Sequence, residues 1–179
     1  MTRLGLLRGI NVGGKNKVEM ARLRDTFERL GGSDVRTYIN TGNVIFDHDQ
    51  PNADLVPRLE VAIAEDFGLD IRVLLRNLEA MTTLAVALPP TWVNGATMKC
   101  DVMFLWDEID SPDVVDRLAI REDIDEVVYV PGALIWKVDR DLVTRSGMMK
   151  LAGTNVYKAM TVRNVNTVRK LVELMTVTE

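Results

Sequence analysis

Apolar residues in the first part of the chain switch from strand-like to helix-like spacing. A short apolar run from Leu4 to Arg8 has the length of a strand, and a glycine-rich stretch from Gly9 to Lys17 follows it. The next apolar residues recur with the spacing of one helical face: Met20, Leu23, Phe27 and Leu30. Two consecutive glycines, Gly31 and Gly32, then end this helix.

After these glycines, apolar and polar residues alternate as they do in a strand. Val35, Thr37 and Ile39 alternate with polar residues, and the segment from Asn40 to Asn43 has the composition of a turn before the apolar run Val44 to Phe46. This pattern predicts a β-hairpin. A second amphipathic helix is expected from Asp54 to Gly68 and a fourth strand from Ile71 to Leu75. Residues 1–76 therefore follow the order strand, helix, hairpin, helix, strand, which is the split βαβ pattern of ferredoxin-like domains.

The second half repeats this order less regularly. The expected elements are a helix over residues 78–88, a strand over 101–106, a helix from Ser111 to Arg121, a hairpin around Pro131 and Gly132, and helices over 142–151 and 164–175. We therefore predict an α+β protein of two ferredoxin-like units with antiparallel sheets and helices packed on one face. The first unit spans residues 1–76, and the second spans 77–179 with an extra C-terminal helix.

The glycine-rich loop carries the most distinctive motif. Residues 9–15 satisfy G-x-x-x-x-G-K, the pattern of a phosphate-binding P-loop between a strand and a helix. Asn16 stands where a P-loop needs a serine or threonine hydroxyl for Mg²⁺. The predicted antiparallel sheet also differs from the parallel sheet of P-loop proteins. Both misfits argue against a nucleoside triphosphatase.

Two interpretations of this loop remain open. Asn16 and Glu19 have the spacing of a capping pair for the following helix, and Gly13 and Gly14 suit a tight turn with positive φ. Free backbone amides beside Lys15 would equally suit an anion.

Topology adds a spatial prediction. In a split βαβ sheet, the loop after the first strand and the turn of the hairpin lie at the same edge. Asn11, Lys15, Asn40 and Asn43 should then be neighbours, although each of the last two is also an ordinary turn residue. Two polar, glycine-containing loops at one edge favour a binding site.

A polar stretch near the C-terminus is the other unusual segment. Asn164 is a plausible N-cap for an amphipathic helix, and Arg163 immediately precedes it. Arg163 is either part of this structural helix start or a further cation at the predicted edge. The complete set of candidate ligand-binding residues is Arg8, Asn11, Gly13, Gly14, Lys15, Asn40, Asn43 and Arg163.

The composition argues against several kinds of site and against membrane association. Cys100 and His48 are the only residues of their types, which argues against an internal disulfide or a Cys/His metal site, and we predict no metal or other cofactor. The charged N-terminus does not resemble a signal peptide, and the stretch from Ala80 to Met98 is too interrupted to cross a bilayer. The expected location is cytoplasmic, with no membrane association.

Charge argues against a nucleic-acid partner. The 26 acidic residues outnumber the 22 basic ones, which gives a net charge of −4 rather than a basic surface. The first strand also lacks the aromatic residues on which RNA-recognition modules stack bases. The sequence gives no indication of the oligomeric state.

Three segments together resemble a known family. Residues 6–16 (LLRGINVGGKN), 37–46 (TYINTGNVIF) and 161–168 (TVRNVNTV) are similar to motifs of the bacterial "domain of unknown function 1697" family. Members more often have tryptophan where this chain has Val165. The resemblance implies paired ferredoxin-like α+β units, and it assigns neither an activity nor catalytic residues.

The favoured function is a module that binds a small anion, such as a phosphate- or carboxylate-bearing metabolite. A metal-dependent phosphoryl or nucleotidyl transfer enzyme is the first alternative, although the acidic runs at 107–110 and 122–126 are typical of solvated loops. An RNA-binding module is the second alternative.

Overall fold

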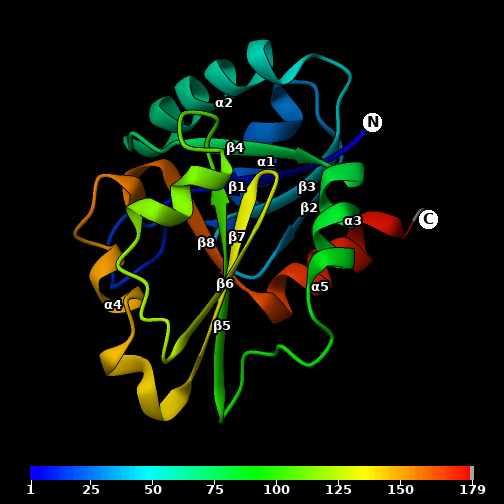
Figure 1. The fold of residues 1–179 in the computed structure, drawn as a ribbon. Coiled ribbons are helices and arrows are strands. Elements are labelled where there is room, and N and C mark those ends of the chain that lie inside the picture. The colour runs from blue at the N-terminus through cyan, green and yellow to red at the C-terminus, as the bar shows by residue number, and fades with distance from the viewer. Residues whose placement is uncertain (178–179) are drawn as a thin grey trace. The chain divides into compact units, whose positions relative to one another are not determined.

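The computed structural model describes residues 1–177 and contains two compact units. One unit comprises Met1–Met81 together with the described residues from Glu173 onward, and the other comprises Thr82–Val172. Each unit contains a four-stranded sheet in which all paired strands are antiparallel (Figure 1). The predicted α+β class with two ferredoxin-like units is therefore confirmed. Within residues 1–177, no helix has both the length and the apolar character needed to cross a membrane.

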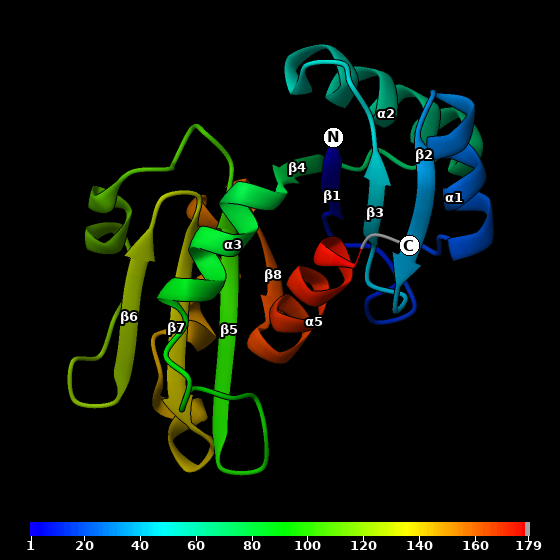
Figure 2. The same ribbon diagram turned by 90° about the vertical axis from the view of Figure 1, so that its right-hand side faces the viewer.

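The first unit has the predicted order of elements. They are β1 (Thr2–Leu7), α1 (Met20–Arg29), β2 (Ser33–Tyr38), β3 (Asn43–Asp47), α2 (Asn52–Phe67) and β4 (Val73–Asn77), and the strands are arranged β2-β3-β1-β4. Both helices cover one face of the sheet (Figure 2). Phe27 of α1 meets Phe46 of β3 edge to face at 5.0 Å in the core between them.

The second unit has a sheet of the same kind, and several of its helical segments are short 3-10 turns. Its elements are α3 (Leu78–Ala87, shared with the first unit), β5 (Met98–Leu105), the 3-10 helix η1 (Pro112–Arg117), β6 (Asp125–Val130), β7 (Ala133–Asp139), η2 (Arg140–Arg145), α4 (Met148–Leu151), η3 (Val156–Ala159), β8 (Met160–Asn164) and α5 (Val165–Thr176, also shared with the first unit). The strand order is β6-β7-β5-β8, which matches that of the first unit position by position.

Three elements of the second unit differ from the prediction. The helix expected from Ser111 is a short 3-10 segment, and the helix expected over residues 142–151 is interrupted at Ser146 and Gly147. The strand β8 was not expected, because its polar residues suggested the start of a helix. It forms through a ladder with β5 that runs from Leu105–Met160 to Asp101–Asn164. Asn164 still accepts the Thr167 amide at 3.0 Å, as an N-cap does.

Gly42 fixes the turn between β2 and β3. Its φ is 81°, and its carbonyl accepts the Leu7 amide at 2.9 Å. A Cβ atom at this position would lie 2.7 Å from the Leu7 Cβ and 2.8 Å from the Ile10 Cδ1. Only glycine satisfies both the left-handed backbone and this close packing.

We predict that Gly42→Ala lowers the free energy of unfolding by about 2–4 kcal/mol, because it combines left-handed strain with overpacking of the core. Gly68→Ala is the matched control, since Gly68 also has a positive φ, 67°, but a Cβ there meets no neighbour within 4 Å. The control should cost only about 1 kcal/mol. Urea denaturation measures both, and equal losses would contradict this account of Gly42.

Candidate functional site

The loop after β1 folds into a small hairpin at residues 9–17. The Asn11 amide donates to the Asn16 carbonyl at 3.0 Å, and the Lys15 amide donates to the Val12 carbonyl at 3.0 Å. Gly13 and Gly14 form its tip with φ values of 58° and 74°. Positive φ at both central residues is typical of two-residue hairpin turns of type I′. The motif that resembled a P-loop is thus a hairpin tip.

The Asn11 side chain connects this hairpin to the turn between β2 and β3. Its Nδ2 donates to the Asn40 carbonyl at 2.7 Å and to the Val18 carbonyl at 2.9 Å. Its Oδ1 accepts the Val18 amide at 2.9 Å. One amide group therefore holds three segments together. The structure brings Asn11 and Asn40 into contact, at the shared sheet edge that the topology predicted.

Asn16 also stabilises the hairpin, and the capping pair predicted for Asn16 and Glu19 is wrong. The N-cap of α1 is Glu19, and its side chain makes no capping hydrogen bond. Asn16 instead has a φ of 51° and donates through Nδ2 to the Gly9 carbonyl at 2.9 Å. The Asn16 side chain therefore stabilises the hairpin and does not cap α1.

Asn43 is buried at the start of β3. Its Nδ2 donates to the Tyr38 carbonyl at 3.0 Å and to the Thr41 hydroxyl at 2.9 Å. These bonds stabilise the turn, which is the ordinary role that the sequence also allowed for this residue. Of the candidate polar residues on this turn, Asn40 is the exposed one.

Cations and unused amides gather at the tip of the hairpin. Lys15 and Lys17 are exposed, and within the described chain neither has a carboxylate at ion-pair distance. The amides of Gly13 and Gly14 donate no hydrogen bond to any described residue. Arg8, at the end of β1, is half-buried, and its backbone amide donates to the Arg72 carbonyl at 3.0 Å.

Strained residues surround this tip. Ile39 has a φ of 50°, which is rare for a β-branched residue, and its side chain is 47% exposed. Asn11 and Asn16 share the left-handed conformation. Such a conformation costs about 1–3 kcal/mol and persists only where neighbouring structure holds it, which is common at binding sites. Residues 9–17 and 39–43 are together called the hairpin edge below.

Arg163 lies in the second unit, in the strand β8, and immediately precedes Asn164, the N-cap of α5. It pairs with Val102 in the β5–β8 ladder and is buried. Its Nη1 donates to the Thr161 hydroxyl at 3.0 Å and to the Val162 carbonyl at 2.8 Å. Burial lowers the pKa of this guanidinium to about 10. Its participation in the hairpin edge stays a prediction.

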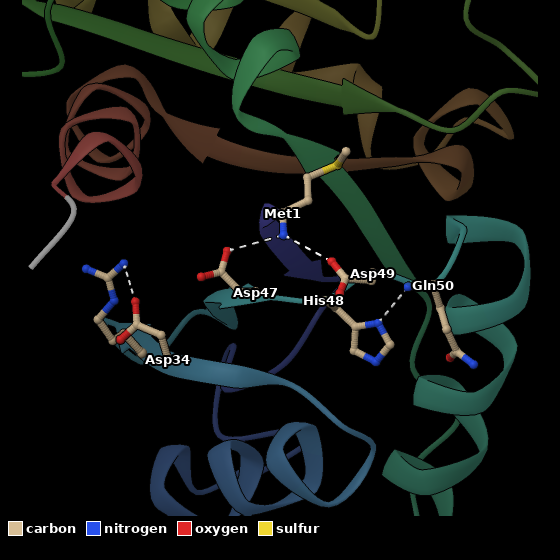
Figure 3. Close-up of polar contacts among 7 residues, drawn as sticks. Met1, Asp34, Asp47, His48, Asp49 and Gln50 are labelled. Atoms are coloured by element: carbon tan, nitrogen blue, oxygen red, sulfur yellow. Dashed lines mark hydrogen bonds and ion pairs between the residues drawn. The ribbon is translucent and has the colours of Figure 1, made fainter.

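The single histidine makes hydrogen bonds that stabilise the fold. At the opposite ends of the strands in the first unit, His48 Nδ1 accepts the Gln50 amide at 3.0 Å (Figure 3). The other ring nitrogen of His48, Nε2, lies 3.2 Å from the Leu30 carbonyl. Nearby, the N-terminal ammonium pairs with Asp47 and Asp49.

In the second unit, burial and then the charge of Asp101 raise the pKa of the Cys100 thiol to about 11. Among residues 1–177, no three His, Cys, Asp or Glu side chains are grouped as metal ligands.

We predict that Asn11→Gly lowers the free energy of unfolding by about 2–3 kcal/mol, because three hydrogen bonds are lost while the positive φ stays permitted. Asn16→Gly is the matched control, since it relieves the same backbone strain and removes one hydrogen bond to Gly9. The control should cost less than about 1 kcal/mol. If urea denaturation shows the reverse order, Asn11 is not the connection that holds this edge.

Comparison with known proteins agrees with this architecture. The structure of the conserved bacterial protein SP0830 from Streptococcus pneumoniae is similar, with a TM-score of 0.82 and 28% sequence identity, and the match covers 98% of each chain. No curated protein matches the sequence. A family model described as "Protein of unknown function (DUF1697)" matches residues 1–136. Together with the motifs at the hairpin edge, this match shows that the chain belongs to the DUF1697 family.

Proposed function

We propose that the first unit binds a small anionic ligand, a phosphate- or carboxylate-bearing metabolite, at the hairpin edge. The observation that carries this proposal is the three-way connection through the Asn11 side chain. It keeps the tip of the hairpin in one conformation beside the β2–β3 turn. A prearranged tip avoids most of the entropy that a flexible loop loses when it binds.

The tip offers the donors that an anion requires. Gly13 and Gly14 present successive backbone amides in the left-handed conformation, and such amides form concave anion sites. Lys15 and Lys17 add positive charge without a competing carboxylate among the described residues. Neither glycine has a side chain that would keep an oxyanion away from the backbone.

The exposure of these amides and lysines determines how tightly an anion is expected to bind. Charges at an open edge are screened by salt and interact weakly in water. We therefore expect a dissociation constant on the order of 0.1 mM at low salt, with weaker binding as ionic strength rises. A ligand of this class belongs to the metabolites of the cytoplasm, the compartment that the sequence predicts.

The two alternatives have less support. RNA-recognition modules stack bases on aromatic residues exposed on the sheet. Phe46, the aromatic residue of β3, is instead buried against Phe27 in the core. For the transfer enzyme, the acidic residues nearest in sequence to the hairpin edge, Glu19 and Asp47, are the N-cap of α1 and a partner of the N-terminal ammonium. Anion binding is the function that the described contacts favour.

We predict that inorganic phosphate, titrated at constant ionic strength, shifts the amide resonances of Gly13 and Gly14 in two-dimensional NMR spectra. The double variant Lys15→Ala, Lys17→Ala should weaken this response at least about tenfold, because it removes both cations at the tip. Arg24→Ala is the control, since Arg24 is an exposed cation of α1 in the same unit.

Pyrophosphate, AMP and citrate in parallel titrations distinguish a preference for phosphate from a preference for carboxylate. Gly13 and Gly14 resonances that stay unmoved by all four anions would refute the proposal. An equal weakening in the Arg24 variant would show that only the overall charge matters.

A further inference from the structure

The second unit contains a separate basic cavity. It has a volume of about 240 Å³ and lies between the chain around residues 119–121 and the segment 144–150. Its lining residues are Ala119, Arg121, Thr144, Arg145, Ser146, Gly147, Met149 and Lys150. Three of these are cations and none is acidic. This set of residues is called the basic cavity below.

One buried carboxylate holds the two walls of the basic cavity together. Asp125, at the start of β6, accepts the Arg121 amide at 2.8 Å on one side. On the other side it accepts the Gly147 amide at 2.9 Å and the Ser146 hydroxyl. The Trp136 indole donates to the same carboxylate at 3.1 Å.

These donors keep Asp125 ionised. Burial on its own raises the pKa of this carboxyl, but the hydrogen bonds from Ser146, Arg121, Gly147 and Trp136 together lower it below its ordinary value. The carboxylate is thus occupied by neutral donors and does not line the cavity. It acts as a fixed connection between the walls.

The backbones of the two walls are also in direct contact. A Cβ atom at Gly147 would lie 1.8 Å from the carbonyl oxygen of Ala119, so any side chain there would displace the wall. The helix predicted over residues 142–151 is interrupted by the extended backbone of Ser146 (φ −66°, ψ 147°), whose hydroxyl donates to Asp125. The shape of the basic cavity is therefore set by packing as well as by hydrogen bonds.

Two of the three cations in this cavity have no carboxylate partner among the described residues. Arg121 pairs with Asp123 at 3.2 Å on the exposed surface. Arg145 and Lys150 are exposed, and neither has a carboxylate partner within residues 1–177. A rigid concave site with excess positive charge attracts and concentrates anions. Arginine in particular matches the geometry of phosphate oxygens through its planar, forked donors.

We infer that the basic cavity binds a small phosphate-bearing anion. Its volume lies below the range of about 300–1,000 Å³ that drug-sized ligands occupy. The ligand class is therefore orthophosphate, pyrophosphate or a short phosphate ester, and a dinucleotide is too large to be enclosed. This site belongs to the second unit alone and does not depend on the function proposed for the hairpin edge.

Isothermal titration calorimetry with pyrophosphate, at constant ionic strength, tests this inference in the full chain. The variant Lys15→Ala, Lys17→Ala is used as the background so that binding at the hairpin edge does not contribute. We expect saturable binding of one pyrophosphate per chain in this background. Adding Arg145→Ala and Lys150→Ala should weaken it at least about tenfold, whereas adding Arg24→Ala should leave it unchanged.

Thermal unfolding of each variant verifies that the fold persists, and the single variant Lys150→Gln replaces the double substitution if it does not. Citrate in a parallel titration separates phosphate recognition from general attraction of a multivalent anion. Three results would overturn the inference: no saturable binding up to about 10 mM pyrophosphate, binding unaffected by the loss of Arg145 and Lys150, or citrate binding as tightly as pyrophosphate.

Discussion

The hydrogen bonds of the Asn11 side chain are the constraint on which the candidate site depends. Without them, the hairpin at residues 9–17, five of whose residues have a positive φ, would be joined to the rest of the unit only through its ends and the buried Ile10. With them, the loop, the approach to α1 and the β2–β3 turn form one edge. The glycines and lysines at its tip then occupy defined positions, and the anion-binding proposal follows from that arrangement.

In each of the two units, one polar side chain and one glycine hold separate loop segments together, but the polar group differs. In the first, a neutral amide connects the loops and Gly42 lets them pack closely. In the second, the ionised Asp125 connects two segments and Gly147 lets their backbones touch. In both, one side chain with several hydrogen bonds and one glycine fix the loops, while the charged groups of the nearby lysines and arginines do not take part in that connection. Cations that are not needed for packing are the groups available to a ligand.

Local patterns predicted the first unit well because its elements are regular. Helical spacing and a terminal glycine located α2, and alternation located the hairpin. The strand β8 was missed because its five residues form a strand only through β5, more than fifty residues earlier in the chain. The predicted strand order was enough to place Asn11 and Asn40 at the same sheet edge. The hydrogen bonds that the side chains of Asn16 and Asn43 make cannot be predicted from the sequence. The basic cavity was missed for the same reason, since it depends on what Asp125 contacts.

Amide hydrogen exchange at Val18, followed by NMR, shows whether the Asn11 side chain holds the hairpin edge together. The Val18 amide precedes α1 and has the Asn11 Oδ1 as its acceptor at 2.9 Å. We expect slow exchange of this amide in the unmodified protein, and exchange at least about tenfold faster in Asn11→Gly, with the amides of β1 unchanged. Rapid exchange of Val18 in the unmodified protein, or equal protection in both proteins, would contradict a hairpin edge held by Asn11.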